Sequence, residues 1–373
     1  MREKRLNAEA GERGTRRWTS AVPISRVALG PALLCLLAIG VLLGGDRVYV
    51  FELGLVGIFA IAAVGQQWIL GRCGQASIGA AAFLGIGAFA TASLSNRSWC
   101  VFPLPIVLAG AIGGASGLLV GLTAVRLRGL YLLLSTLALQ FIALFIFQRY
   151  AGSAGVVFVN VPTLFGQPLQ PGVLFDVVVL LLLAVIIGLI YNAYRSAPGR
   201  AWSAIRENES AARVVGVNVV AWKLFAFAGS SAVTAIAGAM YAYLFQSVPY
   251  QAFSLQLAIS MLVMVYVGGQ RSLSGAVLGA GVVSLIPFIL DRTQAQATNP
   301  TLISWLSTNG PTLNTALYGL ALTLVLLFER GGLAALLARG RDRLLPSKHR
   351  GAGNGSPSVE LDASPAHLSE IPT

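Results

Sequence analysis

The charged side chains that could make specific contacts are concentrated in residues 195–223, between two long apolar stretches. Pro198 and Gly199 indicate a turn near the start of this polar segment. The residues that follow predict a short helix with Trp202 and Ile205 on one face. This chemistry favours docking to a soluble protein, and an amphipathic loop lying on the membrane surface is the competing interpretation.

A second short helix is predicted in the same segment. Asn208 can accept hydrogen bonds from the free N–H groups of a first helical turn, and the carboxylate of Glu209 suits the positive end of the helix dipole. Ala211 and Ala212 continue the helical pattern, and Gly216 can adopt the left-handed conformation that ends many helices. The polar segment therefore predicts a pair of short helices that could insert into a groove of a partner protein.

Glycines and polar residues also interrupt an apolar region at residues 71–79, which read GRCGQASIG. Such residues can break a membrane helix and leave backbone groups to line a cavity, as discontinuous helices do in transporters. We therefore expect a broken helix here, with Gln75 and Ser77 near a translocation pathway. An ordinary tight turn, which Arg72 favours, is the alternative interpretation.

The apolar part of the sequence contains no pattern typical of catalysis or cofactor binding. Cys35, Cys73 and Cys100 lie singly, without metal-ligand spacing, and both histidines fall in the C-terminal tail. No Gly-x-x-x-x-Gly-Lys-Ser/Thr loop occurs, so any ATP that drives this protein must be bound by a separate subunit. Glu52 and Asp176 fall at the ends of apolar runs and are expected to reach the membrane interface. The sequence predicts no enzyme activity, metal or cofactor in this chain.

Composition defines the class of protein that holds these segments. The 373 residues are 56% hydrophobic and 11% charged, whereas about a quarter of the residues in soluble domains are charged. The apolar runs have roughly the 18 to 24 residues that a helix needs to cross a bilayer, and they do not alternate like barrel strands. We expect an all-α, polytopic membrane protein of about ten spans. The expected spans are 27–44, 48–70, 80–95, 103–125, 129–148, 174–193, 223–246, 255–269, 273–290 and 313–328.

Basic residues determine the expected orientation. If both termini are cytoplasmic, the inner segments hold 22 of the 26 Lys and Arg residues, in agreement with the positive-inside rule. The net charge of +12 then reflects membrane topology rather than nucleic-acid binding. On this topology residues 1–26 form a cytoplasmic arm, and residues 27–335 form the transmembrane domain with the polar segment in the cytoplasm. Residues 336–373 form a tail that is first basic and then disordered.

The polar segment also resembles a known element. Residues 199–218, GRAWSAIRENESAARVVGVN, are similar to the cytoplasmic EAA-type loop of bacterial branched-chain amino-acid ABC transporter permeases. Three other stretches resemble motifs of that family in the expected order, namely residues 74–89, 127–138 and 267–280. The resemblance extends over roughly residues 48–335.

The resemblance implies roles for the residues that match these motifs. The positions on the ATPase-coupling loop are Gly199, Arg206, Glu207, Glu209, Ala211, Ala212 and Gly216. The positions on the broken-helix motif near the translocation pathway are Gln75, Ser77 and Gly79. Three residues depart from the family pattern, because Ala80 stands where histidine is common, Arg271 where glycine is common and Ala276 where proline is common.

Permeases of this family are the membrane subunits of importers. The resemblance implies a bacterial inner-membrane protein that moves branched-chain or related amino acids by alternating access. It also implies two cytoplasmic ABC ATPase subunits, a second related permease, and a periplasmic or lipid-anchored substrate-binding protein. The departures at Ala80 and Arg271 leave open a permease of the same family for urea or short amides. A self-contained secondary transporter or facilitator is a further alternative.

Overall fold

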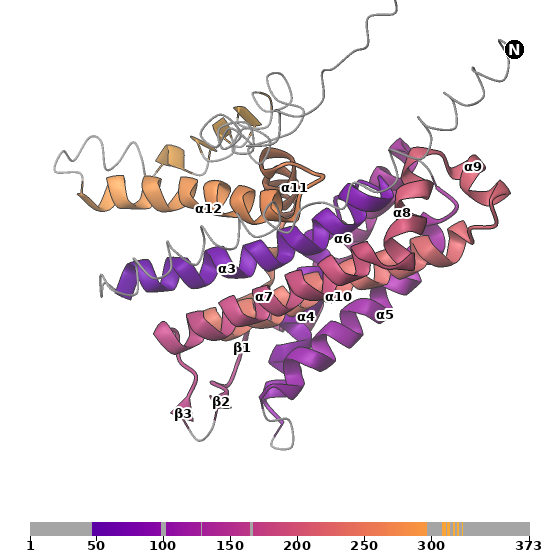
Figure 1. Cartoon of the computed structure of the whole chain (residues 1–373). Coiled ribbons are helices and arrows are strands. Elements are labelled where there is room, and N and C mark those ends of the chain that lie inside the picture. Colours follow the sequence, from indigo (N-terminus) through magenta and orange to yellow (C-terminus); the bar gives the residue numbers. More distant parts are fainter. Residues whose placement is uncertain are drawn as a thin grey trace, which may run out of the picture.

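The computed structural model describes residues 47–97, 102–127, 129–164 and 167–296, together with short helical stretches between residues 308 and 323. Apolar helices pack lengthwise in one bundle (Figure 1). The helices long and apolar enough to cross a membrane are α3 (Arg47–Gln67, continued by the π-helix η1, Trp68–Arg72), α5 (Leu104–Ala124), α6 (Leu130–Ala151, continued by the 3-10 turn η2, Gly152–Ala154), α7 (Val173–Arg195) and α10 (Val219–Phe245). Shorter apolar helices are α4 (Ala80–Ser95), α11 (Leu255–Gly268) and the apolar part, Leu273–Ile289, of α12 (Leu273–Gln296).

These helices confirm the expected class, a polytopic helical membrane protein. Eight of the expected spans coincide with the helices above. The expected span at 27–44, the N-terminal arm and the C-terminal tail lie outside the described residues, and only part of the span at 313–328 is described. The total of about ten spans therefore stays a prediction.

Helix α10 forms the centre of the bundle and packs against α3, α4 and α5. Small residues allow this packing, because side chains cannot fit where the helix backbones touch. A Cβ atom at Gly87 of α4 would meet the backbone of Ala235, and one at Gly238 of α10 would meet the backbone of Leu84. On α5, a Cβ atom at Gly117 would meet the side chain of Ser231.

The two ends of the bundle differ in structure (Figure 1). One end has small antiparallel sheets formed by β1 (Val156–Phe158) with β4 (Ser247–Pro249) and by β2 (Thr163–Leu164) with β3 (Gln167–Pro168). A 3-10 turn, η3 (Tyr250–Phe253), follows β4 and leads into α11. The other end has two short helices, α8 (Ala197–Glu207) and α9 (Glu209–Val214). The strands were not predicted, because two or three residues are too few to show an alternating pattern.

Asp176 corrects one expectation from the sequence. Its side chain is covered by protein rather than exposed at the start of α7, because the residue is only 1% exposed and neither carboxylate oxygen has a hydrogen-bond partner in the described part of the chain. Gly54 of α3 lies directly against the Asp176 carboxylate. The missing side chain at Gly54 lets α7 approach α3 and cover the acidic group, which sequence position alone does not reveal.

Candidate functional site

The two short helices form the expected pair, although α8 begins earlier than predicted. Pro198 and Gly199 lie in the first turn of α8 rather than in a separate turn, because a first-turn N–H has no helical partner for proline to remove. Gly199 is buried where its Cα faces the backbone of Tyr194 at the end of α7. A side chain at this position would collide with that backbone, so glycine permits the sharp bend between α7 and α8.

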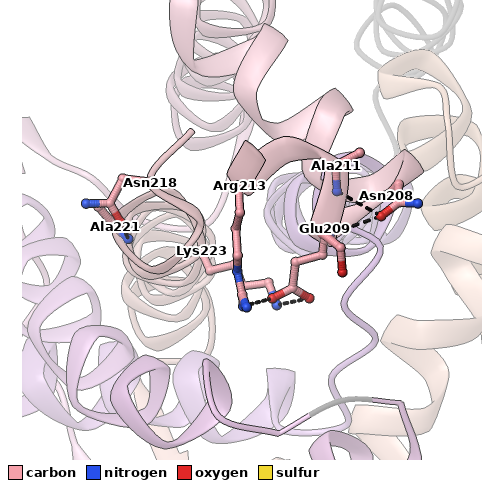
Figure 2. Close-up of polar contacts among 8 residues, drawn as sticks. Asn208, Glu209, Ala211, Arg213, Asn218, Ala221 and Lys223 are labelled. Carbon is pink, nitrogen blue, oxygen red and sulfur yellow. Dashed lines mark hydrogen bonds and ion pairs between the residues drawn. The ribbon is translucent and has the colours of Figure 1, made fainter. Parts of the chain in front are cut away.

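The ends of α9 are capped as the sequence predicts (Figure 2). The side-chain oxygen of Asn208 accepts hydrogen bonds from the backbone N–H groups of Ser210 and Ala211, at 3.0 and 3.1 Å. Gly216 has a φ of 81°, and the N–H of Val217 next to it donates to the Ala212 carbonyl at 3.0 Å. These local hydrogen bonds define a six-residue helix that is too short to be stable by itself.

Glu209 joins α9 to α10 through a pair of ionic contacts. Its carboxylate lies 2.6 Å from Arg213 on the same helix and 3.0 Å from Lys223 in the first turns of α10, as Figure 2 shows. The Arg213 side chain is 53% exposed, whereas the Lys223 side chain is only 5% exposed. Because a buried ammonium group needs a counter-charge, the contact with Lys223 is the one that fixes α9 against the bundle.

An aromatic cluster attaches α8 to the bundle. Trp202 is fully buried, stacks on Phe225 of α10 and meets Trp68 of η1 edge-on at 5.3 Å between ring centroids. Its indole N–H donates to the Trp222 carbonyl at 2.9 Å. Because Trp202 is covered by protein, it does not anchor α8 to lipid headgroups, which argues against the membrane-surface interpretation.

Arg206 connects α8 to the broken helix. Its guanidinium donates a hydrogen bond to the backbone carbonyl of Gly71 in η1, and its side chain also lies against Gly74. Burial lowers the pKa of Arg206, and the nearby charges of Arg271 and Arg72 lower it further. A cation at the carboxyl end of a helix is favoured by the helix dipole, which offsets part of this cost.

The broken helix predicted near residues 71–79 is present. Helix α3 changes into a π-helix at Trp68, regular structure stops after Cys73, and Gly74 has a φ of 69°. Gln66 donates to the Ser77 carbonyl at 2.6 Å, which supports the unwound backbone inside the bundle. The break is therefore a structured segment rather than a tight surface turn.

The three residues predicted for the pathway all lie in this unwound segment. Gln75 and Ser77 are buried, and the Gln75 side-chain oxygen has no partner among the described residues. The Ser77 hydroxyl accepts a hydrogen bond from the N–H of Gly79 at 3.2 Å. Gly79 packs against the backbone of Thr136 on α6. The structure brings them together, and their role in transport stays a prediction.

Further polar contacts link the break to two other helices. Gln67 donates to the Gln270 carbonyl at 3.2 Å, in the turn between α11 and α12, and accepts from the Tyr194 hydroxyl at 3.0 Å. The Arg72 guanidinium lies 4.1 Å from the centre of the Tyr194 ring. The end of α3 is thus the point where α7, α8 and the α11–α12 turn meet.

The predicted coupling residues divide into two groups. The first group faces the bundle. Two of its members, Gly199 and Ala212, are buried, and the other two, Arg206 and Glu209, bind to the bundle through their side chains. The exposed members lie on the outer surface of α9 and its ends, together with two valines that are 90% and 78% exposed. This exposed tip consists of Glu207, Ala211, Arg213, Val214, Val215 and Gly216.

Several residues of this site were not identified from the sequence, notably Trp68, Tyr194 and Gln67. Each acts through a contact with a distant part of the chain, so local periodicity carries no signal for it. Cys73 behaves as the expected apolar filler, because burial raises the pKa of its thiol to about 12 despite nearby Lys223 and Arg206. No cluster of metal-ligating side chains occurs within the part of the chain that the structure describes.

Comparison with known proteins agrees with this architecture. The model of the family described as branched-chain amino acid transport system / permease component matches residues 48–328. The high-affinity branched-chain amino acid transport system permease protein LivM of Salmonella typhimurium is 30% identical over 250 residues, which cover 60% of this chain and 59% of the relative. LivM of Escherichia coli is 28% identical over the same lengths.

A shorter match is to the probable branched-chain amino acid transport permease protein LivH of Methanocaldococcus jannaschii. It is 33% identical over 178 residues, or 44% of this chain and 54% of the relative. The chain thus matches less than two thirds of the length of these curated relatives. No solved structure shows significant similarity. Because the family model matches most of the chain, the protein belongs to the family of branched-chain amino acid transport system permease components, which are transport proteins and not enzymes.

Proposed function

We propose that this protein is the membrane-spanning permease subunit of a bacterial ABC importer, and that α8 and α9 dock to a cytoplasmic ATPase. The observation that carries the proposal is the division of this helix pair into a buried side and an exposed tip. Trp202 and Arg206 hold the pair to the bundle, while Val214 and Val215 project away from it. Exposed apolar residues beside charged ones are typical of a docking surface.

The contacts of α8 suggest how ATP hydrolysis drives transport. A force applied at the exposed tip passes through α8 to Gly71 by way of Arg206, and to Trp68 by way of Trp202. Both targets belong to the π-helix that leads directly into the unwound residues 74–79. ATP is bound and hydrolysed in the partner subunits, and this chain converts their motion into alternating access.

The proposed assembly contains two ATPase subunits, a second related permease and a periplasmic or lipid-anchored binding protein, in the inner membrane with both termini of this chain in the cytoplasm. The proposed cargo is a branched-chain or related amino acid that passes near Gln75, Ser77 and Gly79. Urea or a short amide is the alternative cargo. Equilibrium binding of each cargo to the cognate binding protein distinguishes them, because that protein selects what the importer moves.

The docking role is tested with the double variant Val214→Asp/Val215→Asp. Both side chains are exposed and make no core contact, so the bundle should fold normally while the apolar tip becomes acidic. We expect membrane levels equal to wild type, loss of ATPase co-purification, and loss of uptake. Phe158→Asp is the control, because Phe158 is an apolar residue that is 73% exposed at the opposite end of the bundle. ATPase co-purification that survives the double change would refute docking at this tip.

A further inference from the structure

Two of the short helices begin directly after irregular segments of the chain. Helices α4 and α11 contain 16 and 14 residues, fewer than the ~20 residues of a full membrane span. Each follows a long helix and an irregular segment, since α4 follows α3 and the unwound residues 74–79, and α11 follows α10, β4 and η3. The first three residues of α4 are buried in protein, where free backbone N–H groups are costly, and Phe253, just before α11, is buried as well.

A single buried side chain serves the starts of both helices. Gln140 on α6 is 1% exposed, and its side-chain oxygen accepts a hydrogen bond from the N–H of Ala82 in α4 at 2.8 Å. Its side-chain nitrogen donates to the carbonyl of Phe253 at 2.7 Å, two residues before α11 begins. An amide has one acceptor and two donor hydrogens, so it can join an N–H group to a carbonyl group in this way.

The residue that receives this second hydrogen bond is itself held firmly. The Phe253 ring is fully buried and lies 5.9 Å from the rings of Phe89 and Phe147 and 5.7 Å from that of Tyr241. Gly85 of α4 packs directly on this cluster, because its missing side chain leaves room for the rings of Phe147 and Phe253. The amide bridge and the ring cluster therefore tie the starts of α4 and α11 to the same face of α6.

We propose that Gln140 is a positioning residue that makes α4 and α11 move as one unit with α6 during transport. The irregular segments before α4 and α11 provide joints at which backbone angles can change, whereas the amide bridge fixes the two helix starts relative to each other. The proposal rests on the proposed function, because it concerns how the bundle moves, but the geometry it predicts can be measured without cargo or ATP.

The variants distinguish loss of the Gln140 bridge from a general loss of stability. Gln140→Leu keeps the side-chain size and removes both hydrogen bonds, while Gln140→Glu keeps the acceptor for Ala82 and, when ionised, lacks the donor for Phe253. Ser230→Ala is the matched control, because Ser230 is buried and donates to the Gly65 carbonyl at 2.8 Å between two continuous stretches of helix. It removes a buried interhelical hydrogen bond that does not touch either helix start.

The first measurement is the distance between spin labels at Ser95→Cys on α4 and Ile259→Cys on α11, with the native cysteines replaced, in the purified chain in lipid nanodiscs. We expect a single narrow distance distribution for wild type and for Ser230→Ala, and a broadened one for Gln140→Leu. If Gln140→Leu does not accumulate, Gln140→Glu is measured and should be broadened to a lesser degree. An unchanged distribution in the measured Gln140 variant would overturn the proposal.

The second measurement is cargo transported per ATP hydrolysed in the transporter assembled with its ATPase and permease partners. We expect Gln140→Leu, which removes both hydrogen bonds, to lower this ratio by about tenfold, a factor that corresponds to roughly 1.4 kcal/mol, while ATP hydrolysis continues. Ser230→Ala should keep the wild-type ratio, and a wild-type ratio in Gln140→Leu would overturn the coupled movement. If wild type itself moves no cargo, the proposed function fails, while the distance measurement still decides the role of Gln140.

Discussion

At the scale of single residues, Glu209 stabilises the start of α9 because of where its carboxylate lies. It is the first residue of α9, where a carboxylate is favoured by the helix dipole, and it reaches Lys223 on α10. Lys223 is almost completely buried, so its ammonium group depends on this carboxylate to offset the loss of water. The same carboxylate also meets Arg213, but that contact lies mostly in solvent.

We expect Glu209→Gln to lower the free energy of unfolding by about 1–3 kcal/mol, because Lys223 is left buried without a counter-charge. Arg213→Gln should change it by less than about 1 kcal/mol, since exposed ion pairs contribute little. Unfolding in detergent, followed by circular dichroism, gives both values. The double variant Glu209→Gln/Lys223→Met should recover most of the loss. Equal losses in the two single variants would show that the buried contact stabilises the protein no more than the exposed one.

At the scale of elements, the unwound segment between α3 and α4 is stabilised by close packing as well as by hydrogen bonds. Gly71 lies in η1 with its Cα facing the Gln270 carbonyl and the Gln67 side chain. No side chain fits between these groups without moving the α11–α12 turn or breaking the hydrogen bond between Gln67 and Gln270. A glycine is therefore required here for close approach, although Gly71 lies within a helical element.

Gly71→Ala is expected to destabilise the protein by about 1–3 kcal/mol, the usual cost of forcing an added methyl group into a packed site. Gly188→Ala is the matched control, because Gly188 lies in α7 and a Cβ atom there meets nothing within 4 Å. That change should be neutral or stabilising by about 0.5–1 kcal/mol, as alanine is the better helix former. Thermal unfolding in one detergent compares the two directly, and equal behaviour would contradict the packing role of Gly71.

The elements that the sequence predicted well are those with local signals. Asn208 and Gly216 mark the ends of α9 through their own backbone chemistry, and the apolar runs give most helix bounds within a few residues. Pro198 misled the prediction, because the same residue is typical of a turn and of a first helical turn. The break at residues 71–79 was visible as glycines and polar residues, but its π-helix was not, since no periodicity distinguishes it over five residues.

At the scale of the whole molecule, the contacts that join α8 and the α11–α12 turn to the end of α3 could not be predicted. The hydrogen bond from Arg206 to Gly71 joins residues 135 positions apart, and that from Gln67 to Gln270 joins residues 203 positions apart. Local patterns cannot specify such pairs, and the sequence indicated only that Arg206 lies beside the coupling motif. Together these contacts make the end of α3 the meeting point of four segments, so a displacement of α8 reaches the broken helix directly.

This arrangement predicts that Arg206 couples ATP hydrolysis to transport. In Arg206→Gln the guanidinium is lost, so motion of α8 should reach Gly71 less completely while the exposed tip at Val214 still binds the ATPase. We expect normal ATPase co-purification and a fall of about tenfold in cargo transported per ATP hydrolysed, the effect of losing roughly one charge-assisted hydrogen bond. Arg200→Gln is the matched control, because Arg200 is an exposed arginine on the same helix, and it should leave the ratio unchanged. A ratio that falls equally in both variants would assign the loss to the charge of α8 rather than to its contact with the broken helix.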